Sequence, residues 1–283
     1  SSLIVEIMRK TRIVLIEDTL EVPIDEFRKI GYNIQNMKVR SALTAATSEL
    51  AAEEGVRTSL RLGDSALVVG EVRSAEAKSL YEAMRIGALA NVVMGTIHGS
   101  DPYSVFDRVV NDLGVPRTSF KATDAIIVVN PIKSADGLKK MKRLVQISEV
   151  RKTWEKDPLQ EGGFLDLMKY NAAMDELQAT TDLLNGDSEI LKSIASNVPE
   201  WAGNWDAVWE NILLRAQIKK TLVDFAELSK DSSILEADFV VQSNDAFHRV
   251  SDSVQEESGS LDNKRIFLEW ESWLKKAMKL RQA

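Results

Sequence analysis

Two short apolar runs and the segment between them constrain the fold of this chain most. The first run, Ala66 to Gly70, is followed by Glu71, and the second, Val92 to Ile97, is followed by His98. Both runs are rich in β-branched residues and contain no polar interruption, which is typical of buried parallel strands. We therefore expect an acid and an imidazole just after the carboxyl ends of two strands.

The segment between the two runs predicts a helix from Ser74 to Ala90. Ser74 can cap it, Glu76 suits its first turn, and Leu80, Met84 and Ala88 share one face. A strand, a helix and a strand in this order make a β-α-β unit. In open α/β sheets the ligand crevice lies outside the carboxyl ends of the strands, so Glu71 and His98 should project into one crevice.

Length and composition narrow the possible classes of protein. The 283 residues, 44% hydrophobic and 28% charged, can bury a sizeable core in one large or two modest domains. No stretch approaches the roughly 20 apolar residues of a membrane span, and no cleavage signal is evident, so we expect a soluble, intracellular protein. The absence of cysteine excludes thiolate metal sites and cysteine nucleophiles, two histidines argue against a histidine-built metal site, and the net charge of −7 argues against nucleic acid as partner.

Further strands and helices are predicted along the first half of the chain. The run from Arg12 to Ile16 reads as a buried strand and leads into Glu17 and Asp18, which makes a third strand end with acids. An edge strand is predicted over 34–39, and helices over 24–30, over 49–61 and from Pro102 onward. Strands are also expected over 124–130, 144–150 and 164–170.

Beyond residue 152 the pattern changes to mainly helical. One helix begins at Asn204 and carries an apolar stripe that we expect to be core, formed by Trp205, Val208, Trp209, Ile212, Ala216, Leu222, Val223 and Ala226. A final helix carries Ile266, Phe267, Trp270, Trp273, Leu274 and Met278. Residues 229–265 are polar and weakly periodic, so a loop-rich stretch is expected there. The domains predicted are thus 1–152 and 153–283.

The strand-end residues have a chemical and a purely structural interpretation. A carboxylate at a dry strand end can hold a metal-bound water or polarise an attacking water in phosphoryl transfer. Taken singly, such an acid often only returns the chain to solvent, and a lone histidine beside glycine is often a turn residue. Three such ends in one sheet favour a shared site. Arg57, Arg61 and Arg73 could cover a solvated face, although arginine also reaches transferring phosphates in trans.

Three segments resemble motifs of the type II/type IV secretion ATPases. Ile16 to Thr19, followed by Glu21, resembles their aspartate box, Leu67 to Arg73 their Walker B segment, and Met94 to Gly99 their histidine box. The order and spacing of the three also fit. The resemblance covers residues 1 to about 150. The sequences of residues 83–87 and 122–124 are most similar to the archaeal branch.

The resemblance implies a fold and a cellular role. It implies an α/β, RecA-like P-loop NTPase core with a mostly parallel sheet and helices on both faces, followed by a mainly helical C-terminal extension. Such proteins are cytoplasmic motors, homo-oligomers expected to be hexamers, that hydrolyse ATP with Mg²⁺ at the inner face of a membrane. They drive pilus or archaellum assembly or protein secretion through a membrane platform protein. Contact with the membrane is expected only through partners, and nucleic acid is not expected to bind.

The resemblance also implies roles for individual residues. Glu71 would be the Walker B acid and a magnesium-site residue, Glu17 the water-activating carboxylate with Asp18 beside it, and His98 a reporter of the terminal phosphate. Arg57 and Arg61 are candidates for arginines contributed to a neighbouring site. The cofactor-binding residues expected are Ser1, Ser2, Gly70 and Thr96, with Ser1 also a magnesium ligand.

The sequence departs from the family at the phosphate-binding loop, because no G-x-x-x-x-G-K-[ST] occurs in these residues. Without that loop nothing cradles the phosphates, so these residues alone should be inactive. Ser1 and Ser2 lead into an apolar run that suits the helix after such a loop. We hypothesise that this chain is the product of the downstream part of a split or intein-interrupted gene. The alternatives are a non-catalytic scaffold or docking subunit with a degenerate ATPase fold and, disfavoured by charge, a DNA motor.

Overall fold

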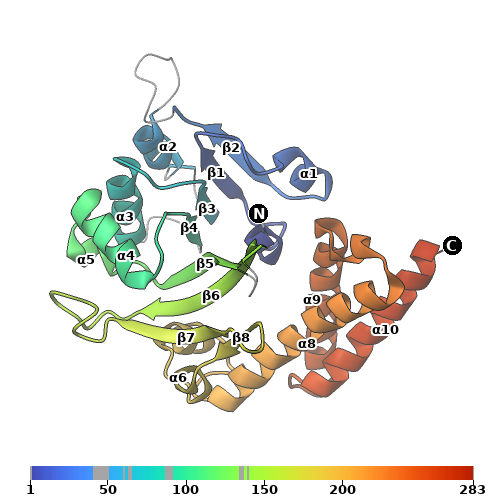
Figure 1. The fold of residues 1–283 in the computed structure, drawn as a ribbon. Coiled ribbons are helices and arrows are strands. Elements are labelled where there is room, and N and C mark those ends of the chain that lie inside the picture. Colours follow the sequence, from blue (N-terminus) through green and yellow to red (C-terminus); the bar gives the residue numbers. More distant parts are fainter. Residues whose placement is uncertain are drawn as a thin grey trace. The chain divides into compact units, whose positions relative to one another are not determined.

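The computed structural model of the chain describes residues 2–40, 51–59, 61–62, 66–86, 92–133, 137–138 and 140–282. Its contacts divide the chain into two compact units (Figure 1). We call residues 9–190 the α/β unit, and the residues up to Met8 together with those from Leu191 onward the helical unit. The boundary expected at residue 152 falls between two paired strands of one sheet, and the units divide near residue 190 instead.

The first half of the α/β unit is built on a parallel sheet. Its strands are β1 (Ile13–Glu17), β2 (Ile34–Lys38), β3 (Ala66–Val69) and β4 (Val93–Gly95), in the order β2-β1-β3-β4. All three pairings are parallel. Every residue of the central strand β1 is buried, which explains its uninterrupted apolar run. The strands and the edge position of β2 follow the sequence prediction.

Short helices pack around this sheet. They are α1 (Ile24–Lys29), α2 (Ala52–Ser59), α3 (Glu76–Ile86), α4 (Pro102–Asp107), the π-helical η2 (Arg108–Asp112) and α5 (Arg117–Phe120). Asp101 caps α4, because its carboxylate accepts the backbone N–H of Ser104 at 2.8 Å. The predicted helix over 74–90 is present as α3 up to Ile86, and the residues 87–90 lie outside the described residues.

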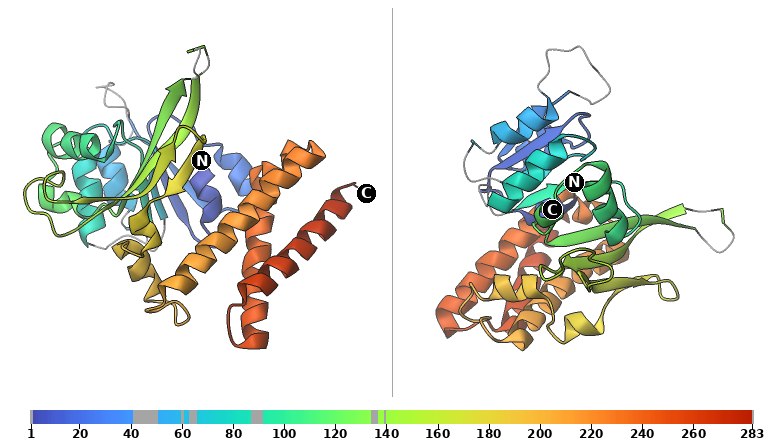
Figure 2. Two further views of the ribbon diagram at one scale, coloured as in Figure 1. Left: turned by 60° about the horizontal axis from the view of Figure 1, so that its bottom comes forward. Right: turned by 90° about the vertical axis from the view of Figure 1, so that its left-hand side faces the viewer.

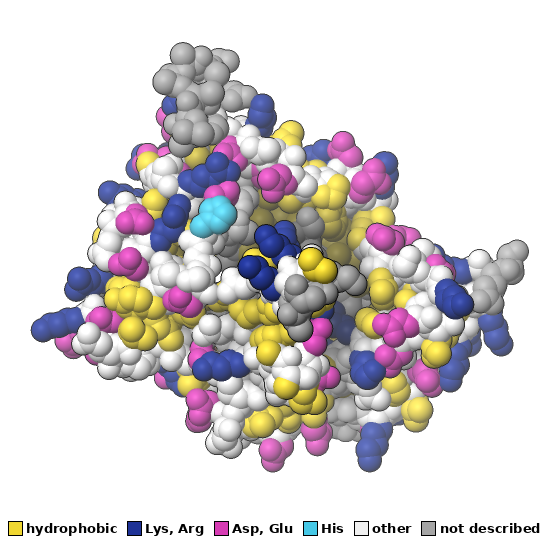
Figure 3. Space-filling model, viewed as in Figure 1, with side chains coloured by type: hydrophobic (Ala, Val, Ile, Leu, Met, Phe, Trp, Pro, Cys, Tyr) yellow, Lys and Arg dark blue, Asp and Glu magenta, His cyan; other side chains and the backbone are white. Residues whose placement is uncertain are grey.

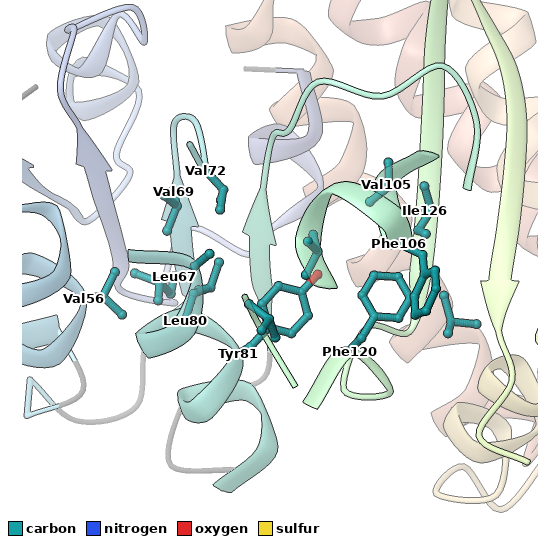
Figure 4. Close-up of a cluster of buried hydrophobic side chains, with 14 of the residues drawn as sticks. Val56, Leu67, Val69, Val72, Leu80, Tyr81, Val105, Phe106, Phe120 and Ile126 are labelled. Atoms are coloured by element: carbon teal, nitrogen blue, oxygen red, sulfur yellow. The ribbon is translucent and has the colours of Figure 1, made fainter. Parts of the chain in front are cut away.

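The apolar core of the α/β unit lies where α2 and α3 meet β3 (Figure 4). Leu67 of β3 lies there between Val56 of α2 and Leu80 of α3. The core continues through an aromatic group in which the ring of Phe106 lies 5.1 Å from Phe120 and 5.5 Å from Trp154, centroid to centroid. This packing holds the strand ends that carry the polar residues.

The second half of the α/β unit is an antiparallel sheet, which corrects the expectation of a mostly parallel core. Its strands are β5 (Ala125–Lys133), β6 (Lys140–Val150), β7 (Phe164–Asn171) and β8 (Glu176–Ala179), paired in that order. All pairings are antiparallel. The connections from β5 to β6 and from β7 to β8 are too short for the crossover that parallel strands require, which explains these two antiparallel pairings. The helix α6 (Thr181–Leu184) follows β8.

The helical unit contains three long helices. They are α8 (Trp205–Ser229), α9 (Ala237–Ser258) and α10 (Asn263–Gln282), with the short η3 (Ser232–Leu235) before α9. The helix α7 (Glu189–Ala195) begins at the division between the units. The expected loop-rich stretch over 229–265 was wrong for its larger part, because α9 buries Phe239, Phe247 and Val254 and exposes its many polar residues.

The predicted helical core is confirmed in α10 and only in part in α8. In α10 Ile266, Trp270, Leu274 and Met278 are buried. In α8 the buried side chains are Val208, Asn211, Leu214, Ile218, Leu222 and Ala226. The predicted stripe through Trp209 and Ala216 is displaced by about one position, so that these residues lie at its margin or outside it.

Residues 2–6 form a short 3₁₀ helix, η1 (Ser2–Glu6), that packs within the helical unit. Ile4 is buried, the Glu6 carboxylate lies 2.5 Å from Lys219 Nζ, and the Asn244 side chain donates to the Val5 carbonyl at 3.1 Å. None of the described helices combines the length and the apolar character needed to cross a membrane.

Candidate functional site

Three polar residues predicted from the sequence lie at one edge of the parallel sheet. Glu17 is the last residue of β1, Glu71 comes two residues after β3, and His98 three residues after β4. The strands are parallel and in register, with Ile16 beside Val69 and Val69 beside Gly95. Their carboxyl ends therefore meet at one edge, which is where α/β sheets hold their ligands.

Glu71 is at the centre of a group of charged side chains. Its Oε2 lies 2.6 Å from Arg73 Nη2, and its Oε1 lies 3.3 Å from His98 Nε2. Arg73 Nη2 also lies 3.6 Å from Asp18 Oδ2. The hydrogen bond with Glu71 and the charge of Asp18 raise the pKa of Arg73 above its ordinary value. Arg73 thus links the acids that follow β1 and β3.

The loop after Glu71 is fixed by a buried carboxylate. Glu76 accepts the backbone N–H of Arg73 at 2.5 Å and that of Ser74 at 2.8 Å, and the Ser74 hydroxyl donates to it at 2.6 Å. Burial alone would raise the pKa of Glu76, but these hydrogen bonds outweigh burial and lower the pKa. The backbone that carries Arg73 is therefore held in place.

Glu17 is almost fully buried and has one oxygen without a partner. Its Oε1 accepts the backbone N–H groups of Glu21 at 3.2 Å and Val22 at 3.1 Å. Its Oε2 has no hydrogen-bond partner among the described residues. A buried carboxylate oxygen without a partner costs stability, so it marks Glu17 as a candidate for ligand binding.

Gly70 lies beside Glu17, and Thr96 bonds to Gly70. A Cβ on Gly70 would lie 3.1 Å from Glu17 Cγ and 3.4 Å from the Ile16 carbonyl oxygen, so glycine allows the close approach of β1 and β3. The Thr96 hydroxyl donates to the Gly70 carbonyl oxygen. These contacts join the ends of β1, β3 and β4.

A pocket of about 230 Å³ opens at this edge of the sheet. It is lined by Asp18, Glu71 and Arg73 and by the first turns of α2 and α3, which add Glu53 and Glu76. Arg40 is the second arginine of the described lining, so four carboxylates face two arginines. Adjacent strand residues point to opposite faces, and Glu17 accordingly does not line this pocket although Asp18 does. The acidic lining favours a cation or a metal-complexed anion.

The remaining predicted residues are not brought to this pocket directly. Arg57 is exposed on α2 and pairs with Glu53 at 2.8 Å, so it reaches the pocket only through that acid. Arg61 is exposed in the turn after α2. Ser2 begins η1 and belongs to the helical unit, and Ser1 lies outside the described residues.

The surface view shows an exposed histidine, in cyan, with basic and acidic side chains around it (Figure 3). The side chain of His98 is 81% exposed, whereas that of Glu71 is 24% exposed.

The sequence did not connect Arg73 with Asp18. Only the fold shows that the Arg73 side chain, two residues after Glu71, lies close to Asp18. Its position directly after the strand-end acid was the available signal.

A family model described as type II/IV secretion system protein matches residues 1–156 of this chain. The match covers more than half of the chain, which therefore belongs to the family of type II/IV secretion system proteins. The sequence prediction of this family is confirmed.

Individual relatives were also found. The uncharacterized protein MJ1287 of Methanocaldococcus jannaschii is 28% identical over 187 residues, which are 65% of this chain and 62% of that protein. The chain thus spans less than two thirds of this relative. The ATPase DotB of Legionella pneumophila has a TM-score of 0.39 and 19% identity over 50% of this chain and 38% of DotB. The VirB11 ATPase of the Brucella suis type IV secretion system has a TM-score of 0.38 and 18% identity over 50% of this chain and 41% of VirB11.

Proposed function

We propose that this chain carries the acidic half of an ATP-hydrolysing site in a secretion or pilus motor. The observation that carries the proposal is the placement of Glu71, between Arg73 and His98, beside a pocket at the carboxyl edge of a parallel sheet. Membership of the secretion-system family supports the biological role. The archaeal branch, with pilus or archaellum assembly or protein export as the process driven, is part of the proposal.

Each side chain has a proposed task. Glu71 would orient a metal-bound water. Glu17 lies on the other face of β1 from the pocket lining, and we propose that its partnerless Oε2 turns toward the attacking water to accept a proton. His98, which is largely exposed, would meet the terminal phosphate. Gly70 and Thr96 hold the strand ends at which these groups lie.

The donor set fits ATP with Mg²⁺ better than a metal alone. Among the described residues no three acidic, histidine or cysteine side chains come together as a cage for a metal ion. Carboxylate oxygens suit Mg²⁺, which usually keeps several waters and shares its ligands with substrate phosphates. When bound, Mg²⁺ would neutralise the charge of the phosphates. Glu71 is the protein group proposed to lie beside it, and the magnesium role expected for Ser1 stays a prediction.

The assembly is proposed to be a homo-oligomer, with six copies as the expected number, at the cytoplasmic face of a membrane platform protein. Arg57 and Arg61 support this part of the proposal, because both are exposed and could reach a neighbouring site. A non-catalytic scaffold is the alternative. The observation favouring it is the lack of a G-x-x-x-x-G-K-[ST] motif in these residues.

A fusion that supplies a phosphate-binding loop ahead of Ser2 tests the proposal. The fusion should hydrolyse ATP, and Glu71→Gln should lower turnover by at least about 100-fold while ATP binding persists. Glu26→Gln is the matched control, because Glu26 is an exposed acid of α1 that pairs with Lys29. Hydrolysis by the Glu71 variant at the level of the control would contradict the assignment. ATP binding without turnover by the unmodified fusion would favour the scaffold.

A further inference from the structure

Among the described strands, the outer ends of β5 and β6 pair only with each other and form a two-stranded ribbon. Residues 129–133 of β5 pair with residues 140–144 of β6, whereas β7 pairs with β6 only from Gln146 to Val150. We call these paired residues the distal ribbon. In the right-hand view of Figure 2 the green strands run outward past the rest of the α/β unit.

One face of the distal ribbon carries three lysines. Lys133 lies directly opposite Lys140, and Lys142 lies opposite Pro131, two residues further along the same face. All three are exposed, and none has an acidic partner among the described residues. Like charges directly opposite each other destabilise a sheet. The arrangement therefore costs stability unless an anion meets this face.

The composition around these lysines is unusual for a chain of net charge −7. From Val129 to Leu144 the sequence has five lysines and arginines but one acid, Asp136, and its neutral polar side chains are Asn130 and Ser134. Leu138 is 84% exposed and Val129 is 56% exposed. Arg143, on the other face, is bound to Asp175 at 2.7 Å and does not add to the lysine group. Cations and exposed apolar side chains thus occur together.

We propose that the distal ribbon binds the surface of an anionic lipid bilayer. Lysines beside exposed apolar side chains are typical of segments that lie at a membrane interface, where anionic headgroups attract the cations. An acidic protein partner would be expected to meet neutral hydrogen-bonding side chains as well, and the ribbon offers almost none. The proposal goes beyond the catalytic role and does not depend on it, and it adds direct lipid contact to contact through partners.

Vesicle sedimentation with the full chain tests this proposal. The chain should bind vesicles of phosphatidylcholine containing one third phosphatidylglycerol, and should not bind vesicles of phosphatidylcholine alone. Each lysine near an anionic surface strengthens binding about 5-fold, so changing Lys133, Lys140 and Lys142 to glutamine should weaken binding about 100-fold. Circular dichroism of the variant checks that it folds.

The matched control changes Lys275, Lys276 and Lys279 of α10 to glutamine, which removes the same charge from exposed positions of a helix where Lys275 pairs with Glu271. This control should bind the anionic vesicles nearly as well as the unchanged chain. Equal weakening of both variants, or no binding by the unchanged chain, would overturn the proposal. Binding to poly-glutamate but not to vesicles, lost only in the ribbon variant, would also overturn it and assign the ribbon to an acidic protein.

Discussion

The two sheets of the α/β unit place their polar residues in opposite ways. In the parallel sheet β1 and β3 are apolar along their length, and the polar groups Glu17, Glu71 and His98 come at or after the strand ends. In the antiparallel sheet polar residues lie along the strands. The side chains of Gln146, Ser148 and Asp166 hydrogen-bond to one another on one face of the sheet. The side chain of Glu149, the next residue after Ser148, is buried apart from this group.

The difference follows from how each sheet is covered. The strand β1 is buried throughout, so the β1 segment can be polar only where it leaves the sheet. Antiparallel strands alternate between two environments, so the register decides which polar residues meet. In the parallel sheet, the role of a polar residue can therefore be inferred from its distance to the strand end. In the antiparallel sheet, its role depends on the residue that faces it on the neighbouring strand.

The largest effect is expected at Glu149 of β6. Its carboxylate accepts the Ser188 hydroxyl at 2.6 Å and the Glu189 backbone N–H at 3.0 Å, and its side chain is 1% exposed. Glu149→Leu removes the buried acceptor of both hydrogen bonds and should lower the free energy of unfolding by about 3 kcal/mol, measured with urea. The exposed Glu155→Leu is the control, and an equal effect of both changes would refute the role assigned to burial.

A smaller effect is expected at Gly70, at the edge of the parallel sheet. The Cβ of Gly70→Ala would lie 3.1 Å from Glu17 Cγ, so the acid must move. We expect a loss of about 1–2 kcal/mol in the free energy of unfolding. Adding Glu17→Asp, which shortens the acid, should recover part of this loss. No recovery in the double variant would show that the contact with Glu17 is not the cause.

Glu76 should give a pH-dependent effect of about 1 kcal/mol. Its folded-state pKa is lowered, so its carboxylate stabilises the fold above the unfolded pKa of about 4.3, and this contribution is lost as the pH falls through the folded pKa. The difference in melting temperature between the unchanged chain and Glu76→Gln should accordingly be present at pH 7 and shrink in acid. A difference that stays constant with pH would contradict this.

The smallest effect is expected in the distal ribbon. Lys140→Glu converts the facing pair with Lys133 into an opposite-charge pair and should stabilise the fold by about 0.5 kcal/mol. Lys140→Gln removes the repulsion only, so its gain should be smaller. Urea unfolding at low salt measures both, and high salt should reduce both gains. Destabilisation by Lys140→Glu would mean that the register of the ribbon is not the one described.

Much of the parallel sheet could be predicted from the sequence, because its information is local. An uninterrupted apolar run such as Ile13–Ile16 predicts a buried strand, and the acid that follows it predicts the edge. The expectation that Glu71 and His98 share a site rests on this logic, and the structure places them 3.3 Å apart. The capping pattern at Asp101 and Pro102 predicts the start of α4 for the same local reason.

The remaining features depend on contacts between distant residues. Nothing in the sequence indicates which residue Arg73 pairs with. Only the pairing of β1 with β3 brings Asp18 close to it. The strand β8 has four residues, too few for a periodic signal. The polar composition of α9 hides the positions that it buries, and nothing in residues 2–6 indicates that Lys219 and Asn244 will hold them. The individual roles proposed for Glu17, Arg57 and Arg61 stay predictions.

The attachment of η1 to the helical unit has a consequence for synthesis on the ribosome. Residues 2–8 leave the ribosome before the helical unit that holds them, because Lys219 and Asn244 are made more than 200 residues later. At the usual 5–20 residues per second this delay is on the order of tens of seconds. The intervening α/β unit can fold during that time. Residues 2–8 can thus take their place only after the helical unit has been made, and until then Ile4 must remain without its buried site.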